Sequence, residues 1–526
     1  MNSRSPLSLL ACSALAVGTF VALPTATAAA APVRYEAERA PATCDGTIDS
    51  DWTGYSGSGF CNGRNAVGAA VQFTVDAAQA GTATLRVRFA NGTTTARPAS
   101  VTVNGSAAAS TSFASTGAWN TWASQTLTVP VRAGGNTIRL SPTAATGLPN
   151  VDALDVEVSG GTTPPSSGAL YVAPNGSDGA AGTQSAPTTL TSAISRVAPG
   201  GTIYLRGGTY RYSQTVTVPA GKNGTSSART TLSAYPGETP VLDFSAMTEA
   251  PANRGLAVNG SYWHVKGIVV ERAGDNGIFV GGSHNVFERT VTRFNRDSGL
   301  QLSRMASTTP RDQWPSHNLV LSAESHDNAD SDGEDADGFA AKLTVGPGNV
   351  FRYAVAHNNI DDGWDLYTKT DTGPIGPVTI EDSLAYANGT LSDGTVNANG
   401  DRNGYKLGGE DIGVDHVIRR SIAYRNGKHG FTYNRNPGTM SVSDNISVDN
   451  AQRNFSFDAG TSVFRNNVSC RAGSGTNDKT VGDVDGSNQF WLGSNGSRCS
   501  SYAGAMAWSF ASDGRLAVTF GGNPVS

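Results

Sequence analysis

The segment Asn349–Tyr367 reads NVFRYAVAHNNIDDGWDLY and contains one unit of a repeat that recurs through the second half of the chain. A strand-like part ending in Asn is followed by a polar residue, a Gly and an apolar residue. The strand-like part returns as NVFERTVTRFN, NLVLSAESHDN, VTIEDSLAYAN and HVIRRSIAYRN, and the glycine part as AGDNGIFV, NRDSGLQL, EDADGFAAKL, DRNGYKLGG and GKHGFTY. Successive glycines, residues 277, 299, 338, 363, 404 and 430, lie 22, 39, 25, 41 and 26 residues apart. The basic unit therefore has about two dozen residues, and two units carry insertions of roughly fifteen.

A unit of this length, with short strands, Asn at the bends and no helical period, predicts one coil of a right-handed parallel β-helix. The asparagines that end the strand-like parts are expected to stack into a structural ladder along one corner: Asn295, Asn328, Asn359, Asn388, Asn426 and Asn450. Pro187–Val197 has the pattern of a short amphipathic helix. Because the first coil of a solenoid exposes its core and strand edges, we expect this helix to cap the open end.

The residues before the repeat belong to a different kind of domain. Segments such as ATLRVRFAN, ASVTVNG and WASQTLTVPV alternate apolar and polar residues between Gly and Asn turns, which is typical of a β-sandwich. Ser159–Gly168 reads SGGTTPPSSG and is predicted to be a flexible linker. The predicted all-β chain is therefore divided into a signal peptide at 1–31, a β-sandwich (jelly-roll) module at 32–158, a linker at 159–168 and a β-helix at 169–526.

The first residues predict export. Arg4, the apolar run Leu9–Leu23 and the small-residue tract Ala26–Ala31 have the order of a cleaved secretory signal, so a secreted, extracellular protein is expected. The four remaining cysteines form two local pairs, Cys44 with Cys61 and Cys470 with Cys499, which predicts two disulfides in an oxidising compartment. A net charge of −5 argues against a nucleic-acid partner, and no second apolar run predicts a membrane span.

Superposing the units on their glycines sorts the flanking residues into columns. The first and third residues after Gly are almost all apolar, so these columns should line the interior, and the second residue should then face solvent. That outward column places Asp365 and Lys406 on consecutive coils, roughly 5 Å apart. The column before Gly stacks Asp337 on Asp362, with Asp361 beside it.

These four aspartates predict a cation site. Taken singly, Asp-Gly pairs are ordinary turns and a lone lysine is an ordinary solvated residue. Carboxylates in register would repel one another unless a cation lay between them, and oxygen-only ligands favour calcium. A neighbouring cation lowers the pKa of a lysine. We therefore expect Lys406 to be the base that removes a proton α to a uronate carboxylate, which would give a 4,5-unsaturated product at alkaline pH.

The motifs ADGFAAK, NIDDGWDLY and NGYKLGG resemble those of polysaccharide lyase family 9, the calcium-dependent pectate lyases with a parallel β-helix. The resemblance covers roughly Leu170 to the C-terminus. It implies calcium bound by Asp337, Asp361, Asp362 and Asp365, and Lys406 as the base. Further galacturonate carboxylates would pair with side chains flanking the site, for which the candidates are Lys342, Arg402, Asn434 and Arg435.

The N-terminal module resembles carbohydrate-binding module family 35 through YEAERA, GYSGSGF, VRFANG and NVDALDVE. The resemblance implies a structural calcium held by Glu36, Glu38 and Asp152. It also implies sugar contacts from Tyr55, Trp119 and Asn150, with uronic acids as the ligand that matches the lyase. Aromatic residues of a sandwich are as often part of its core.

Other readings of the repeat remain open at this point. A β-helix glycoside hydrolase acting on pectin would use an acid and a base for water attack and would need neither calcium nor Lys406. The chain could also be a lyase for another uronic-acid polysaccharide, or a non-catalytic carbohydrate-binding solenoid. The leading expectation is a monomeric pectate lyase that acts on pectate (polygalacturonate).

Overall fold

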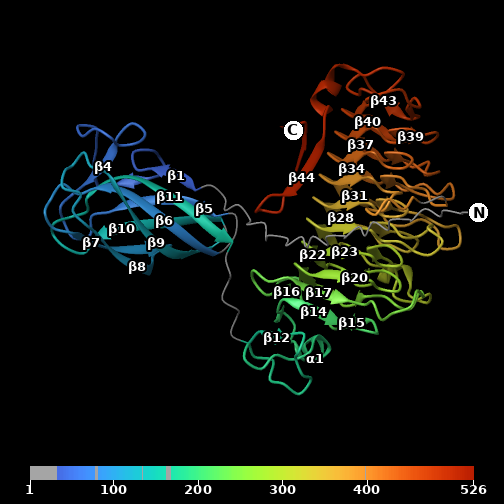
Figure 1. Cartoon of the computed structure of the whole chain (residues 1–526), viewed down its shortest axis with the longest axis horizontal. Coiled ribbons are helices and arrows are strands. Elements are labelled where there is room, and N and C mark those ends of the chain that lie inside the picture. Colours follow the sequence, from blue (N-terminus) through green and yellow to red (C-terminus); the bar gives the residue numbers. More distant parts are fainter. Residues whose placement is uncertain (1–31, 78–80, 133, 161–167, 397–398, 526) are drawn as a thin grey trace, which may run out of the picture. The chain divides into compact units, whose positions relative to one another are not determined.

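The computed structural model describes residues 32–77, 81–132, 134–160, 168–396 and 399–525. The chain divides into two compact units, one ending at Ser159 and one beginning at Gly160 (Figure 1). The predicted signal peptide at 1–31 and most of the predicted linker lie outside the described residues. No helix in the described ranges is long and apolar enough to cross a membrane.

The N-terminal unit is a sandwich of two antiparallel sheets, with strand orders β3-β4-β11-β6-β9 (β1 also pairs with β11) and β2-β5-β10-β7-β8. The strands are β1 (Val33–Glu36), β2 (Thr43–Cys44), β3 (Gly46–Asp49), β4 (Phe60–Gly63), β5 (Val71–Ala77), β6 (Gly81–Ala90), β7 (Arg97–Val103), β8 (Ser106–Phe113), β9 (Ala123–Val131), β10 (Gly134–Pro142) and β11 (Asn150–Gly160). Alternate residues of β5 and β7 are buried, as the sequence pattern predicts, and a disulfide joins Cys44 to Cys61.

The second unit is a parallel β-helix whose coils stack three sheets (Figure 1). The twelve-stranded sheet contains β12 (Leu170–Val172), β13 (Thr202–Leu205), β16 (Thr230–Ala234), β19 (Trp263–Lys266), β22 (Val286–Glu288), β25 (Leu319–Leu321), β28 (Asn349–Arg352), β31 (Val378–Glu381), β34 (Val417–Arg419), β37 (Ser441–Ser443), β40 (Val463–Arg465) and β43 (Asp483–Val484). Each strand pairs in parallel with the equivalent strand of the next coil.

The other two sheets have ten strands each. The first, which we call the covered sheet, contains β14 (Gly208–Arg211), β17 (Pro240–Asp243), β20 (Val269–Glu271), β23 (Val291–Arg293), β26 (Glu324–His326), β29 (Val355–His357), β32 (Leu384–Tyr386), β35 (Ile422–Tyr424), β38 (Ile446–Val448) and β41 (Val468–Cys470). The second, the site sheet, contains β15 (Val216–Val218), β18 (Leu256–Val258), β21 (Ile278–Val280), β24 (Leu300–Leu302), β27 (Phe339–Ala341), β30 (Trp364–Asp365), β33 (Tyr405–Lys406), β36 (Phe431–Thr432), β39 (Phe455–Phe457) and β42 (Lys479–Thr480). The repeat glycines immediately precede site-sheet strands.

The interior is a continuous apolar stack. The residues one after the repeat glycines point inward and are fully buried, and Trp364, Tyr405, Phe431 and Phe455 stack with centroid separations of 4.8, 4.7 and 5.0 Å. At the corner, each asparagine of the predicted ladder donates its side-chain N–H to the side-chain oxygen of the next, over 2.8–3.0 Å. The ladder is confirmed, and it satisfies amides that would otherwise be buried without partners.

A short helix covers the first coil of the β-helix. Helix α1 (Leu190–Arg196) buries Leu190, Ala193 and Ile194 against the first coil. It begins later than the predicted Pro187 because Thr189 is its N-cap and accepts the N–H of Ser192. Two short 3₁₀ segments, Arg311–Gln313 and Ser497–Tyr502, complete the helical residues that the structure describes.

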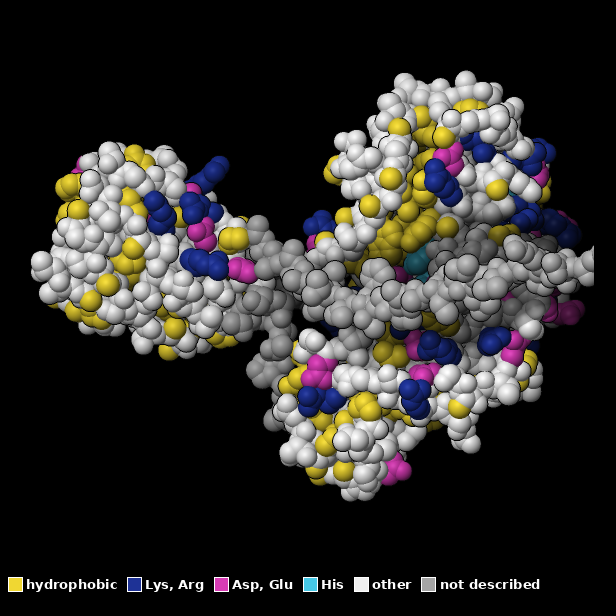
Figure 2. All heavy atoms as spheres, viewed as in Figure 1, with side chains coloured by type: hydrophobic (Ala, Val, Ile, Leu, Met, Phe, Trp, Pro, Cys, Tyr) yellow, Lys and Arg dark blue, Asp and Glu magenta, His cyan; other side chains and the backbone are white. Residues whose placement is uncertain are grey.

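At the C-terminus, β44 (Met506–Phe510), β45 (Leu516–Phe520) and β46 (Asn523–Pro524) form an antiparallel sheet. Val518 and Phe520 pack on apolar residues of the covered sheet, including Leu384 and Ile446. Hydrophobic side chains gather alongside this segment in Figure 2. The disulfide Cys470–Cys499 ties the segment that leads to it to strand β41.

His416 is a buried residue whose charge state should affect stability. Its Nδ1 accepts the N–H of Val378, and burial lowers its pKa from 6.5 to about 3. Between about pH 6.5 and pH 3 the histidine is protonated in the unfolded chain and neutral in the folded chain. The free energy of unfolding therefore falls as the pH falls through this range. At pH 5 the cost should be about 2 kcal/mol.

We predict that His416→Asn reduces this acid sensitivity, because an amide oxygen can accept the same N–H without titrating. The measurement is urea unfolding at pH 7 and pH 5, with the loss between the two smaller in the variant than in the wild type. Equal losses in both proteins would show that His416 does not carry the effect.

Candidate active site

Strands β30 and β33 place an acid and a lysine side by side. Asp365 and Lys406 are direct partners in the parallel register of the two strands. Their predecessors, Trp364 and Tyr405, stack in the core, so the alternation of a strand turns Asp365 and Lys406 away from it. The adjacency predicted from the glycine columns is confirmed.

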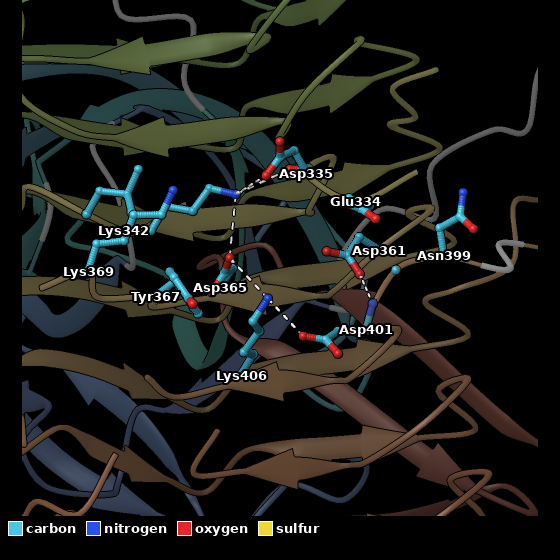
Figure 3. A pocket seen from close by; sticks show the side chains of 12 residues that line it. Glu334, Asp335, Lys342, Asp361, Asp365, Tyr367, Lys369, Asn399, Asp401 and Lys406 are labelled. Carbon is cyan, nitrogen blue, oxygen red and sulfur yellow. Dashed lines mark hydrogen bonds and ion pairs between the residues drawn. The ribbon is translucent and has the colours of Figure 1, made fainter. Parts of the chain in front are cut away.

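The prediction that this column faces solvent is wrong. Phe279 and Ala340 are fully buried, and Asp365 and Lys406 are only 4% and 7% exposed. The side chains point away from the core, but other residues cover them: the Arg254 guanidinium lies 3.4 Å from the centre of the Phe279 ring. Asp401, in the loop before β33, covers Lys406, with its Oδ2 3.1 Å from Lys406 Nζ (Figure 3). The sheet face is therefore the floor of a recess.

Three aspartates form an acidic cluster at this floor. One carboxylate oxygen from each of Asp337, Asp362 and Asp365 lies within 4.8 Å of the others, the only such group in the described part of the chain. Burial, with the charge of Asp365 adding, raises the pKa of Asp337 to about 7. Burial and neighbouring carboxylates also hold the pKa of Asp362 well above its usual range. Carboxylates held this close favour a cation between them.

The donor set fits a hard cation. Asp365 Oδ1 is buried and has no hydrogen-bond partner, and Asp362 Oδ2 accepts no hydrogen bond, although Lys406 Nζ lies 3.3 Å from it. Buried carboxylate oxygens of this kind suit calcium, which takes oxygen ligands and tolerates irregular coordination. Asp361, the fourth predicted ligand, lies beside the cluster and lines the same pocket, but its Oδ1 accepts the backbone N–H groups of Asp401 and Arg402. Asp361 therefore also anchors the loop over the site.

Two lysines lie on either side of Asp365 (Figure 3). Lys406 Nζ is 3.3 Å from Asp362 Oδ2, 3.5 Å from Asp365 Oδ2 and 3.1 Å from Asp401 Oδ2. Lys342 Nζ is 2.8 Å from Asp337 Oδ2 and 3.5 Å from Asp365 Oδ2. Burial lowers the pKa of Lys406, but Asp365 and Asp362 outweigh it and raise that pKa. The protein's own charges thus hold Lys406 as an ammonium group.

A pocket of about 370 Å³ opens over these groups. Sequence reasoning identified Lys342, Asp361, Asp365 and Lys406 among its lining residues. The insertion before Gly338, which holds Glu334 and Asp335, could supply one further ligand by the same reasoning. The remaining lining residues, Leu343, Tyr367, Lys369, Asn399, Gly400 and Asp401, were not predicted. Asp401 carried a usable signal, because it lies in the insertion that leads directly to the Gly404 strand.

The comparisons with known proteins agree with this geometry. The family described as "Pel9A-like, right handed beta helix region" matches residues 170–467, which is more than half of the chain. The chain belongs to this family.

The Pel9A-like chain is similar to pectate lyase L of Paenibacillus polymyxa (strain SC2), with 55% identity over 326 residues that cover 62% of this chain and 72% of the relative. It is also similar to the crystal structure of pectate lyase Pel9A, with 33% identity, a TM-score of 0.56, and coverage of 66% of this chain and 86% of that one. These matches confirm the predicted resemblance to polysaccharide lyase family 9, the right-handed β-helix and the enzyme class, a polysaccharide lyase.

The family 35 carbohydrate-binding module matches residues 33–159 of the Pel9A-like chain, which confirms the second predicted resemblance. This part is similar to endo-1,4-beta-xylanase B of Cellvibrio japonicus (strain Ueda107), with 46% identity over 123 residues that cover 23% of this chain and 20% of the relative.

Three of the predicted substrate residues of the Pel9A-like domain lie outside the pocket lining. Arg402 folds over Gly389 and Gly427, and its backbone N–H donates to Asp361 Oδ1 over 3.2 Å. Asn434 donates its side-chain N–H to the Gly408 carbonyl over 2.7 Å, and Arg435 pairs with Asp411. Lys342 does reach the pocket, where its partner is Asp337.

The predicted calcium ligands of the module converge on one loop. Ser56 donates its hydroxyl to Glu36 over 2.8 Å and its backbone N–H to Asp152 over 2.9 Å, and Ser58 donates its N–H to Glu38 over 2.8 Å. Burial, with the charges of Glu38 and Asp152, raises the pKa of Glu36. Glu38 Oε2 is buried without a hydrogen-bond partner, so at least one oxygen is open to a cation.

The predicted sugar contacts of the module have different surroundings. Trp119 is half-buried, with its ring 5.3 Å from the Arg97 guanidinium. Tyr55 is half-buried against Phe60, with ring centroids 5.8 Å apart. Asn150 begins β11 and is 5% exposed, so only a small part of its side chain could reach a ligand.

Proposed function

We propose that this protein is a secreted, calcium-dependent pectate lyase, which cleaves polygalacturonate by β-elimination to 4,5-unsaturated oligogalacturonides. The observation that carries the proposal is the contact between Lys406 and the acidic cluster on adjacent coils. A hydrolase would need a water between an acid and a base, whereas here the amine directly contacts candidate metal ligands. The pectate lyase relatives support the choice of pectate.

The chemistry divides between a cation and the protein's own groups. Calcium bound by Asp337, Asp362 and Asp365 would neutralise those carboxylates and the substrate uronate, which makes the C5 proton of the uronate more acidic and the neutral amine of Lys406 accessible. Lys406 Nζ takes the C5 proton. The C5–H electron pair becomes the C4–C5 double bond, the C4–O bond breaks, and the leaving oxygen takes up a proton from solvent.

Two further groups position the base. Asp401, 3.1 Å from Lys406 Nζ, holds the amine over the pocket and is itself held by Lys428 at 2.7 Å. Lys342 neutralises Asp337 from the opposite side of Asp365. Removal of the substrate proton therefore takes place between two fixed ion pairs, which limits the movement of the base.

We predict that chelation abolishes activity and that added calcium restores it. The assay follows the ultraviolet absorbance of the unsaturated product and, in parallel, the release of reducing ends from polygalacturonate. Reducing ends without absorbance would mean that the chain is a hydrolase, and no cleavage with or without chelator would mean a binding solenoid. Full absorbance change in chelator would contradict calcium dependence.

The module is proposed to bind uronic-acid polysaccharide and to keep the lyase on its substrate. Its calcium would be held by Glu36, Glu38 and Asp152, and the sugar contacts would come from Tyr55 and Trp119, with Asn150 in a minor part. Residues 1–31 are proposed to direct export and to be removed. We expect a monomer, which light scattering of the mature chain would check.

A further inference from the structure

Three basic side chains continue from the active site toward the C-terminal end of the site sheet. They are Lys428, Arg453 and Lys479, which we call the basic row. Strand register fixes the place of Lys479: Lys406 pairs with Thr432, Thr432 with Ser456, and Ser456 with Lys479. Lys479 therefore stands in the same column as Lys406, three strands away, or about 14 Å at the usual strand spacing.

Arg453 continues the column that contains the metal candidates. Each repeat glycine donates its backbone N–H to a carbonyl oxygen on the next coil. The acceptor is the residue just before the position that is equivalent to the glycine. Gly338 donates to Asp362, Gly363 to Asn403, Gly404 to His429 and Gly430 to Arg453. Arg453 thus takes, three coils on, the position that Asp362 takes at the acidic cluster.

Lys428 joins the basic row to the active site. Its Nζ is 2.7 Å from Asp401 Oδ1, and the other oxygen of Asp401 is 3.1 Å from Lys406. His429, between them, adds no charge near neutral pH, because burial and the charges of Lys428 and Arg453 lower its pKa to about 4. The row is therefore linked to the base through Asp401.

The basic row carries more positive charge than its own partners neutralise. Asp458 is a shared counter-ion, 3.0 Å from Lys479 and 4.0 Å from Arg453. With Asp401 paired to Lys428 and Asp458 shared between Arg453 and Lys479, the row keeps an excess of one positive charge. The side chains of Lys428, Arg453 and Lys479 are 30%, 31% and 49% exposed, so a ligand can reach them.

The opposite direction along the same sheet has no comparable excess of positive charge. The coils that precede the acidic cluster carry Asp275 and Asp297, and the neighbouring cations are Arg254, 3.4 Å from Asp275, and Lys342 near Asp297. A polyanion such as a uronate chain is therefore attracted more strongly on the side of Lys406 that carries the basic row.

We propose that the basic row binds the carboxylates of successive uronate residues on the C-terminal side of the cleavage point, and so fixes the direction in which the polymer leaves the catalytic base. The inference rests on the proposed function, whose substrate it extends from one reacting uronate to a length of chain.

The test compares a long and a short substrate in the presence of calcium. In the Arg453→Gln/Lys479→Gln variant, two charges are removed at positions that contact neither Lys406 nor the acidic cluster. We expect KM for hexagalacturonate to rise roughly tenfold, because each exposed charge pair contributes a factor of a few. We expect kcat to change less than about twofold, and KM for trigalacturonate, which reaches less of the row, to change less than about threefold. Added salt should weaken hexagalacturonate binding more in the wild type than in the variant.

Two further variants keep the result interpretable. Arg465→Gln is the matched control, because Arg465 is an exposed cation paired with Asp483 on neighbouring coils but belongs to β40 of the twelve-stranded sheet. It should leave both KM values unchanged. Lys479→Glu, at a half-exposed site, should raise KM for hexagalacturonate even if the double variant fails to fold.

Unchanged KM values in folded variants, or equal rises for both substrates, would overturn the inference. If the wild type forms no unsaturated product, the proposed function fails separately. Calorimetry of hexagalacturonate binding to the same variants then tests the role of the basic row. Weaker binding only in the variants of the basic row would support that role, and equal binding in all variants would overturn it.

Discussion

Replacing Lys406 by Ala is expected to lower kcat for unsaturated-product formation about 1,000-fold, because a positioned general base contributes roughly 10²–10⁴ to such a step. Lys406→Arg is the sharper variant. Arginine keeps the positive charge that faces Asp362 and Asp365, but it does not deprotonate in proteins, so we expect the same loss. The measurement is the initial rate of absorbance change on polygalacturonate with saturating calcium, and thermal unfolding checks the fold.

Lys369 provides the matched control for that experiment. It lines the same pocket but is exposed, so Lys369→Gln should retain activity within about tenfold. A Lys406→Arg variant with near wild-type kcat would show that another group takes the C5 proton. A Lys369→Gln loss as large as that of Lys406→Ala would show that the pocket needs its charge as a whole rather than one base.

Asp362→Asn is expected to remove most of the calcium binding of the β-helix while leaving it folded. The amide oxygen can still accept the Asn403 N–H that Asp362 accepts, and one carboxylate is lost from a buried, self-repelling cluster. At a calcium concentration about 100-fold above Kd, the wild type should gain about 2.7 kcal/mol of unfolding free energy. A variant with 100-fold weaker binding would gain only about 0.4 kcal/mol.

Calcium titration by calorimetry on the full chain measures this effect, with activity as a second readout. The calcium proposed for Glu36, Glu38 and Asp152 serves as an internal reference in the same titration. Asp382→Asn, a residue paired with Arg420 away from the pocket, should leave both binding steps intact. Unaltered calcium binding in Asp362→Asn would remove Asp362 from the metal site.

The coil architecture and the central part of the site could be predicted because a parallel solenoid repeats its register. Once one residue per coil is recognised, every residue at the same offset must stack, as Asp365 on Lys406 and Trp364 on Tyr405 do. The asparagine ladder followed from the same rule. No comparable rule says how deeply a column is covered, which is why the outward column was wrongly expected to be solvated.

Residues at loops and bends could not be predicted in the same way. Arg402, Asn434 and Arg435 have φ values of +59°, +43° and +62°, a left-handed backbone that the repeat pattern does not reveal. Such a conformation is uncommon for non-glycine residues, and an arginine gives no signal of it. Asp401 lies at the end of an insertion, where the equivalence between coils is lost, so only its nearness to Gly404 could have marked it.

Strands and insertions of the β-helix differ in how freely their length can change. A shift of one residue within β33 would exchange Tyr405 and Lys406 between the core and the pocket, so the length of that strand is fixed. The insertion between Asn388 and Asp401 is under no such constraint, because its ends are held by the asparagine ladder and by Asp361. Natural variation and protein engineering can therefore reshape the walls of the pocket by altering loop length alone, and inherit the catalytic strand pair unchanged.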